Sequence, residues 1–182
     1  MKGNVIVGQS GGPTAAINSS LAGVYTAAAA KGVKVYGMVN GIEGLLKGKY
    51  TDLSTQFKNE NDIELLKRTP SSFLGSCRYK LPEYTKDEAP YIKLFETFKE
   101  LDIKYVTYIG GNDSMDTIMK LSAYAESINS DIRFMGVPKT IDNDLSGTDH
   151  TPGFGSAAKY VAATMKEVIC DCNVYDMKAV TI

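Results

Sequence analysis

Three short stretches of the chain bring glycines together with charged and hydroxyl side chains. The first runs from Gly8 to Thr14 and contains the pair Gly11-Gly12. The second is Gly110–Ser114, and the third is Pro138–Asp144, with the sequence Pro-Lys-Thr-Ile-Asp-Asn-Asp. Paired glycines let backbone N–H groups approach an anion closely, and a lysine beside two carboxylates offers both a cation and a base.

These side chains match the needs of one type of reaction. Phosphoryl transfer requires a donor cradled by amides and cations, a metal, and a carboxylate that faces the acceptor hydroxyl. A single Gly-Gly loop is equally well explained as a tight turn between a strand and a helix, and Asp142 and Asp144 alone would be read as turn caps. The three stretches together are harder to explain by packing, and they favour phosphoryl transfer.

The elements that must position these stretches alternate along the chain. The β-rich apolar runs that predict strands are Val5–Val7, 33–39, 105–109, 133–137 and, at the end, 178–182. The periodic segments that predict helices are 13–31, 54–68, 91–101, 114–127 and 155–170. In the fourth helix, the pattern turns Ile118, Met119, Leu121 and Ala125 inward. Residues 69–90 carry three prolines and are expected to form mostly loop.

Alternation of strands and helices at this spacing predicts an α/β fold, a Rossmann-like, doubly wound, mostly parallel sheet. In such a sheet, the loops at the carboxyl ends of the strands lie along one edge, where ligands bind. All three glycine or aspartate stretches follow predicted strands, so we expect them to meet there. The chain ends on an apolar, strand-like run with no closing element, and we therefore expect it to be truncated.

The amino-acid composition limits the classes of molecule that the chain is expected to bind. The chain has 182 residues, a net charge of −1 and a pI near 5.9, which gives no electrostatic footprint for nucleic acid or an anionic membrane. The longest apolar stretch, 21–30, is about half a membrane span. The three cysteines are odd in number and poorly spaced for a disulfide or zinc site. These features predict a cytoplasmic protein that binds neither nucleic acid nor membrane.

Five motifs, in order along the chain, resemble those of the phosphofructokinase family. They are Ser10–Asn18, Gly41–Leu45, Leu74–Arg78, Gly110–Ser114 and Pro138–Asp144. The resemblance covers nearly all of the chain. It implies that residues 1–182 form the N-terminal domain that binds the phosphoryl donor, incomplete at its C-terminus, and that sugar-phosphate contacts lie beyond Ile182.

The resemblance also implies roles for individual residues. Asp142 would take the proton from the sugar 1-hydroxyl, and Lys139 would stabilise charge on the transferring phosphoryl group. The residues that would bind the donor are Gly11, Gly12, Arg78, Gly111, Asp113 and Ser114. The residues that would bind the substrate are Thr140, Ile141, Asp142 and Asp144. Asn112 stands where most relatives carry a magnesium-binding Asp; its amide oxygen is a weaker ligand for Mg²⁺.

The residues at two positions indicate which phosphoryl donor the protein uses. Relatives that use ATP typically have Gly where Asp113 and Lys139 stand. A carboxylate at position 113 would repel the α-phosphate of ATP, and a cation at position 139 would stabilise the leaving phosphate. Both features favour inorganic pyrophosphate.

The resemblance therefore predicts a pyrophosphate-dependent 6-phosphofructokinase of glycolysis. It would use Mg²⁺, bind pyrophosphate and fructose 6-phosphate, and assemble as a homo-oligomer when full-length. Two alternatives stay open: an ATP-dependent phosphofructokinase, and an inactive fragment or regulatory subunit that binds phosphates without turnover.

Overall fold

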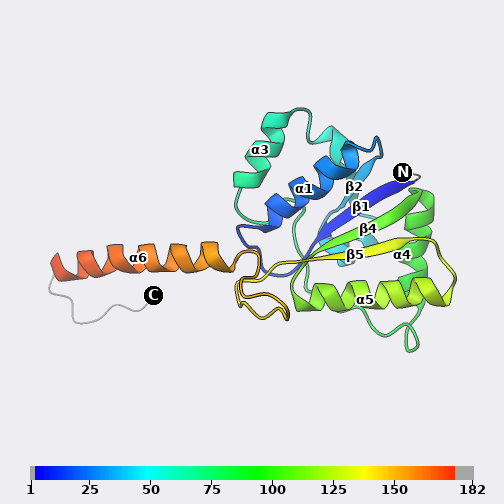
Figure 1. Cartoon of the computed structure of the whole chain (residues 1–182). Coiled ribbons are helices and arrows are strands. Elements are labelled where there is room, and N and C mark those ends of the chain that lie inside the picture. The colour runs from blue at the N-terminus through cyan, green and yellow to red at the C-terminus, as the bar shows by residue number, and fades with distance from the viewer. Residues whose placement is uncertain (1–2, 175–182) are drawn as a thin grey trace.

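The computed structural model describes residues 3–174, which form an α/β domain around one five-stranded sheet (Figure 1). The strands are β1 (Asn4–Gln9), β2 (Val35–Met38), β3 (Tyr50–Asp52), β4 (Ile103–Gly110) and β5 (Arg133–Pro138). The helices are α1 (Ile17–Ala29), α2 (Gly41–Leu46), α3 (Glu60–Arg68), α4 (Ala89–Glu100), α5 (Asn112–Ser127) and α6 (Phe154–Val174), with a 3₁₀ turn, η1, at Leu53–Thr55.

The strand order is β3-β2-β1-β4-β5, and every pairing is parallel except that of β2 with β3. The predicted mostly parallel, doubly wound sheet is therefore confirmed. From β1 the chain first winds outward to β2 and then returns to place β4 on the other side of β1. The carboxyl ends of β1 and β4 thus flank the point where the winding reverses, which is where open α/β sheets bind ligands.

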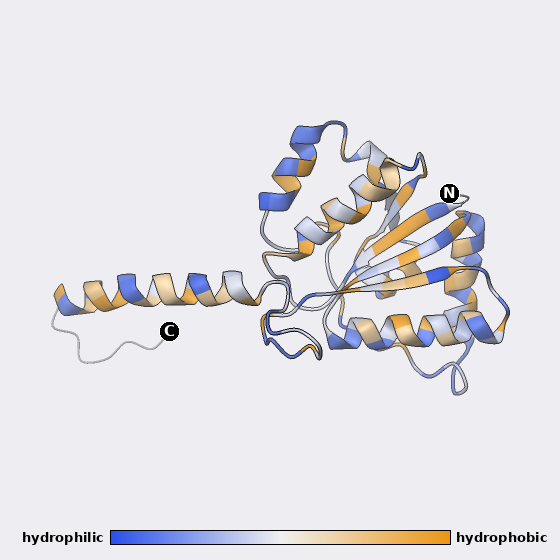
Figure 2. Cartoon of the chain, viewed as in Figure 1, coloured by the Kyte–Doolittle hydropathy of each residue, from blue (hydrophilic) through white to orange (hydrophobic). Residues whose placement is uncertain are grey.

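Alternate residues of each strand face two separate cores. Ile6, Val106 and Tyr108 pack with α2, α4 and α5 on one face of the sheet. Val5 and Val7 pack with α1 and α3 on the other face. Val5, Ile6 and Val7 of β1 are buried, and Figure 2 shows an apolar centre in β1 and a mixture of apolar and polar residues in β4.

Several predicted boundaries are wrong for local reasons. The first helix begins at Ile17 rather than Pro13, because residues 13–16 form a turn in which the Thr14 hydroxyl accepts from the Ala16 N–H. The helix predicted at 54–68 is replaced by η1 followed by α3, because Asn59 forms a capping box that starts a new helix at Glu60. Met119 points outward, with 63% of its side chain exposed.

The structure also adds elements that the sequence did not predict. The Gly41–Leu45 motif is the core of helix α2, and β3 follows it as an antiparallel edge strand. The predicted helix at 155–170 is α6, which extends away from the sheet (Figure 1). Its apolar side chains Val161, Met165 and Ile169 are exposed. The strand predicted at 178–182 lies outside the described residues.

Candidate active site

A cavity of about 630 Å³ opens at the carboxyl edge of the sheet, between the loops that follow β1, β4 and β5. All the residues predicted from sequence to bind donor, substrate or metal line this one cavity. They are Gly11, Gly12, Arg78, Gly111, Asn112, Asp113, Ser114, Lys139, Thr140, Ile141, Asp142 and Asp144. Three cations (Arg78, Lys80 and Lys139) and three carboxylates (Asp113, Asp142 and Asp144) face the same space.

The glycine loop after β1 has a conformation that only glycine adopts easily. Gly11 has a φ of 76°, and a Cβ at this position would lie 3.3 Å from Lys139 Nζ. Its N–H donates to the Cys77 carbonyl, and its own carbonyl accepts from Ser76 Oγ at 2.5 Å. The segment of residues 76–78, which was predicted to be loop, therefore holds the glycine loop in place.

The loop after β4 ends in a true helix N-terminus. Gly111 is the N-cap of α5, whose first turn carries Asn112, Asp113 and Ser114. The N–H groups of a first helical turn have no partner within the helix, and the helix dipole favours an anion at this position. Gly110 lets the loop close tightly, since a Cβ there would lie 1.9 Å from Ser114 Oγ. Within residues 3–174, the first turn of α5 lines the cavity, whereas no residue of α1 or α6 does.

Lys139 is the most buried charge in the site, with only 4% of the residue exposed. Its Nζ donates to the Gly12 carbonyl, so it lies across the glycine loop from β5. Burial lowers the pKa of Lys139 below its usual 10.5, and the carboxylate of Asp142 acts in the opposite direction. A buried ammonium without a carboxylate in direct contact is well suited to bind an anion.

Asp142 lies in a turn that its neighbours hold from several sides. Its backbone N–H donates to Thr140 Oγ1 at 3.0 Å, and the Thr140 carbonyl accepts from Thr151 Oγ1 at 2.7 Å. The Thr140 N–H donates to the Pro152 carbonyl, which ties the turn to the residues before α6. The carboxylate of Asp142 is exposed towards the cavity.

Asn112 and Asp144 join two of the loops directly. Asn112 Nδ2 donates to Asp144 Oδ2 at 2.7 Å. The amide nitrogen is thus used within the protein, while the Asn112 amide oxygen and Asp144 Oδ1 make no hydrogen bond to any other residue in the range 3–174. Among residues 3–174, no three His, Cys, Asp or Glu side chains gather in a way that would hold a metal ion by themselves.

Lys80 and Cys77 also line the cavity, although the sequence alone suggested no role for either side chain. Lys80 could have been found from the basic pair it forms with Arg78 two residues earlier. Burial raises the pKa of the Cys77 thiol, but hydrogen bonds from the backbone at Glu43 and Tyr79 and from the side chains of Tyr108 and Ser10 together bring the pKa below 9.0. Cys77, Cys170 and Cys172 are free thiols.

The model of the family described as "Phosphofructokinase" matches residues 4–174 of this chain. The chain belongs to the phosphofructokinase family. A pyrophosphate–fructose 6-phosphate 1-phosphotransferase from Xanthomonas campestris pv. campestris is 45% identical over 169 residues, which is 93% of this chain and 40% of the relative. This family member and others like it are more than twice as long as the chain, which spans about 40% of their length.

Solved phosphofructokinase structures share the fold. The crystal structure of a pyrophosphate-dependent phosphofructokinase from Marinobacter aquaeolei superposes with a TM-score of 0.82 at 43% identity, covering 93% of this chain and 42% of that one. The enzyme of the same description from Nitrosospira multiformis gives a TM-score of 0.86 at 40% identity, covering 97% and 44%. Among residues 3–174, no helix combines the length and apolar character that crossing a membrane requires.

Proposed function

We propose that this chain carries the donor site and the catalytic base of a pyrophosphate-dependent 6-phosphofructokinase. The reaction would move a phosphoryl group from pyrophosphate to the 1-hydroxyl of fructose 6-phosphate, giving fructose 1,6-bisphosphate and orthophosphate. One observation carries the proposal: the buried ammonium of Lys139 lies against the glycine loop in the cavity that Asp142 also lines. Residues 1–182 would form the N-terminal donor-binding domain.

The donor would be held by backbone and by charge. The glycine loop at Gly11-Gly12 and the first turn of α5 supply N–H groups, and Ser114 and Arg78 add side-chain donors on the same cavity. Lys139 is already removed from water, so its charge acts on a bound phosphate with little solvent screening. As the bridging P–O bond of pyrophosphate breaks, Lys139 would stabilise the negative charge on the departing orthophosphate.

Asp142 would act as the general base. Its carboxylate would accept the proton of the sugar 1-hydroxyl while that oxygen forms the new bond to phosphorus. The turn held by Thr140 and Thr151 fixes the backbone that carries this carboxylate. Thr140, Ile141 and Asp144 line the same wall and would contact the substrate there.

The donor set fits Mg²⁺ that arrives with pyrophosphate. Hard carboxylate and amide oxygens are the ligands Mg²⁺ prefers, and this ion commonly binds through one or two protein carboxylates plus substrate phosphates. The second oxygen of Asp144 and the amide oxygen of Asn112 would hold it. When bound, the ion would neutralise charge that develops on the phosphoryl group.

The choice of pyrophosphate over ATP rests on Asp113 and Lys139. Both line the cavity; Asp113 lies in the first turn of α5, and Lys139 is the most buried of the charged residues there. We also predict a glycolytic role, a cytoplasmic location and a homo-oligomeric assembly for this protein. The free thiols are consistent with a reducing compartment.

Activity can be tested in a chimera in which this chain replaces the matching 40% of the Xanthomonas campestris relative. Turnover of fructose 6-phosphate would be followed with pyrophosphate and Mg²⁺, and separately with ATP. We expect activity with pyrophosphate and a much lower kcat/KM with ATP. A chimera that prefers ATP would contradict the donor assignment, and a folded chimera without activity would favour a non-catalytic phosphate-binding role.

A further inference from the structure

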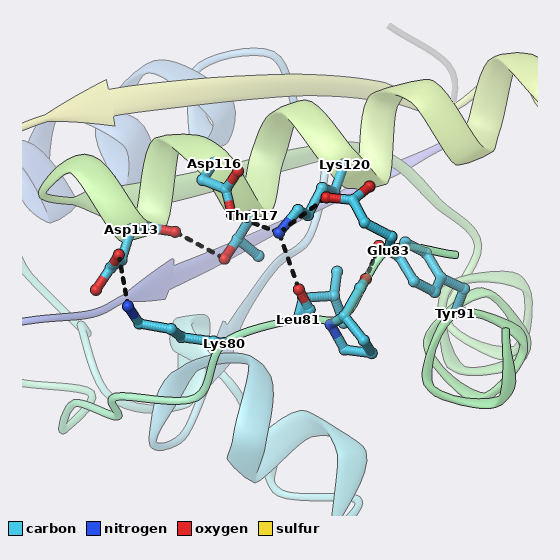
Figure 3. A network of polar contacts seen from close by, with 9 residues as sticks. Lys80, Leu81, Glu83, Tyr91, Asp113, Asp116, Thr117 and Lys120 are labelled. Carbon is cyan, nitrogen blue, oxygen red and sulfur yellow. Dashed lines mark hydrogen bonds and ion pairs between the residues drawn. The ribbon is translucent and has the colours of Figure 1, made fainter. Parts of the chain in front are cut away.

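A second lysine, Lys80, lies at the rim of the cavity and is exposed, whereas Lys139 is buried. Lys80 Nζ lies 3.6 Å from Asp113 Oδ1, and both side chains are 78% exposed (Figure 3). Both residues also line the cavity. The cavity therefore has one cation deep inside it and another at its opening.

The backbone that carries Lys80 is fixed onto the neighbouring helices. Lys120 of α5 donates to the Leu81 carbonyl at 3.1 Å and pairs with Asp116 at 2.7 Å and with Glu83 at 3.4 Å (Figure 3). Only 16% of the Lys120 side chain is exposed, so water screens these contacts less than it screens surface pairs. The segment 80–83 is thus held beside α5.

A second contact secures the same segment from α4. The hydroxyl of Tyr91, a fully buried residue, donates to the Pro82 carbonyl at 2.6 Å. Contacts at residues 81, 82 and 83 thus hold the backbone that follows Lys80 against α4 and α5. The ammonium can then reach only a limited region at the cavity rim, next to the first turn of α5.

The ion pair with Asp113 does not by itself account for the placement of Lys80. Exposed pairs add little to stability, because water solvates both partners well. The pair offsets part of the charge of Asp113, whose carboxylate repels anions beside the first turn of α5. An ammonium has three N–H donors, so Lys80 can keep Asp113 and still bind an oxygen of a second group.

We propose that Lys80 is a further donor-binding residue, which takes the outer phosphate of pyrophosphate while Lys139 takes the inner one. This inference rests on the proposed function, and it explains how a carboxylate at position 113 is compatible with a highly charged donor. It also predicts that pyrophosphate and orthophosphate differ in their dependence on Lys80. On this assignment pyrophosphate uses both lysines, one for each phosphate, whereas orthophosphate bound at Lys139 does not depend on Lys80.

The test is calorimetric titration of the 182-residue chain with pyrophosphate and, separately, with orthophosphate. The variants are Lys80→Met, Lys80→Arg and the control Lys86→Met, which removes an exposed lysine of the same loop outside the cavity. For loss of one charge-assisted contact, we expect Lys80→Met to weaken pyrophosphate binding by about tenfold or more. Orthophosphate binding should be unchanged, Lys80→Arg should largely restore pyrophosphate binding, and Lys86→Met should behave as the wild type.

The outcomes separate this inference from the function on which it rests. If wild type binds pyrophosphate and Lys80→Met binds it equally well, Lys80 is not a donor ligand, and the proposed function stands. If Lys80→Met weakens both anions equally, Lys80 acts only through its long-range charge, and the inference is wrong. If folded wild-type chain binds neither anion, the donor site itself is wrongly assigned and both proposals fail.

Discussion

Lys139 offers the sharpest test of the donor site, because it is both buried and charged. Lys139→Met keeps most of the side-chain length and removes the ammonium. At about 4 Å and an effective dielectric constant of about 20, one unit charge contributes about 4 kcal/mol to its attraction for another. Measured net values for hydrogen bonds to charged groups are lower, about 1.5–3 kcal/mol. We therefore expect pyrophosphate to bind about 10–150-fold more weakly to the variant.

The effect of this substitution on stability should be small, because two contributions oppose each other. The variant loses the hydrogen bond to the Gly12 carbonyl, and it also loses a buried charge. The pKa of Lys139 is lowered in the folded protein, so the unfolded chain binds its proton more tightly. Protonated Lys139 therefore reduces stability at neutral pH, and this penalty disappears as pH rises towards 10.5.

The assay combines calorimetry with thermal unfolding at pH 7. Lys93→Met, an exposed lysine on α4, is the matched control and should bind pyrophosphate like the wild type. We expect Lys139→Met to unfold close to the wild-type midpoint while losing most of its affinity. Wild-type affinity in a folded Lys139→Met protein would refute the reasoning. So would an NMR titration in which the Lys139 pKa is not below 10.5.

Three further predictions address the other charged groups of the site. In the chimera, Asp142→Asn should lower kcat by about 10²–10⁴-fold, and a variant that keeps more than about a tenth of wild-type turnover would exclude Asp142 as the base. The double substitution Asp113→Gly with Lys139→Gly should shift the ratio of kcat/KM values from pyrophosphate towards ATP; an unchanged ratio would show that these residues do not set donor choice. Asn112→Asp should replace the hydrogen bond to Asp144 by a like-charge contact that a cation relieves. We therefore expect the variant to bind Mn²⁺ without pyrophosphate, measured by electron paramagnetic resonance, and more tightly than the wild type does.

Much of the site could be predicted because its signals are local. Glycine pairs after apolar runs mark strand-to-helix turns, and parallel strands place all such turns on one edge. Lys139 and Asp142 could be assigned to the same site as Gly11 on that basis, and the structure brings them to one cavity. The residue types then point to phosphoryl transfer, since few other reactions need amides, a cation and a carboxylate together.

Other features depend on contacts between residues far apart in the chain. The segment 69–90 has no periodicity, yet Ser76 fixes the Gly11 carbonyl and Lys80 reaches Asp113. The start of α1 was missed because the Thr14 turn competes with the helix over residues 13–16. Helix α2 was missed because its six residues are too few to show a helical pattern.

Local sequence patterns are enough to predict the class of fold, the edge of the sheet where the cavity lies, and most of the residues that line it. These follow from side-chain periodicity and from the backbone freedom of glycine, which are properties of short segments. Tertiary structure alone decided which charges are buried, which are paired, and which face the cavity freely. Burial of Lys139 and pairing of Asn112 with Asp144 depend on β4 and β5 lying side by side, and no local pattern encodes those distances.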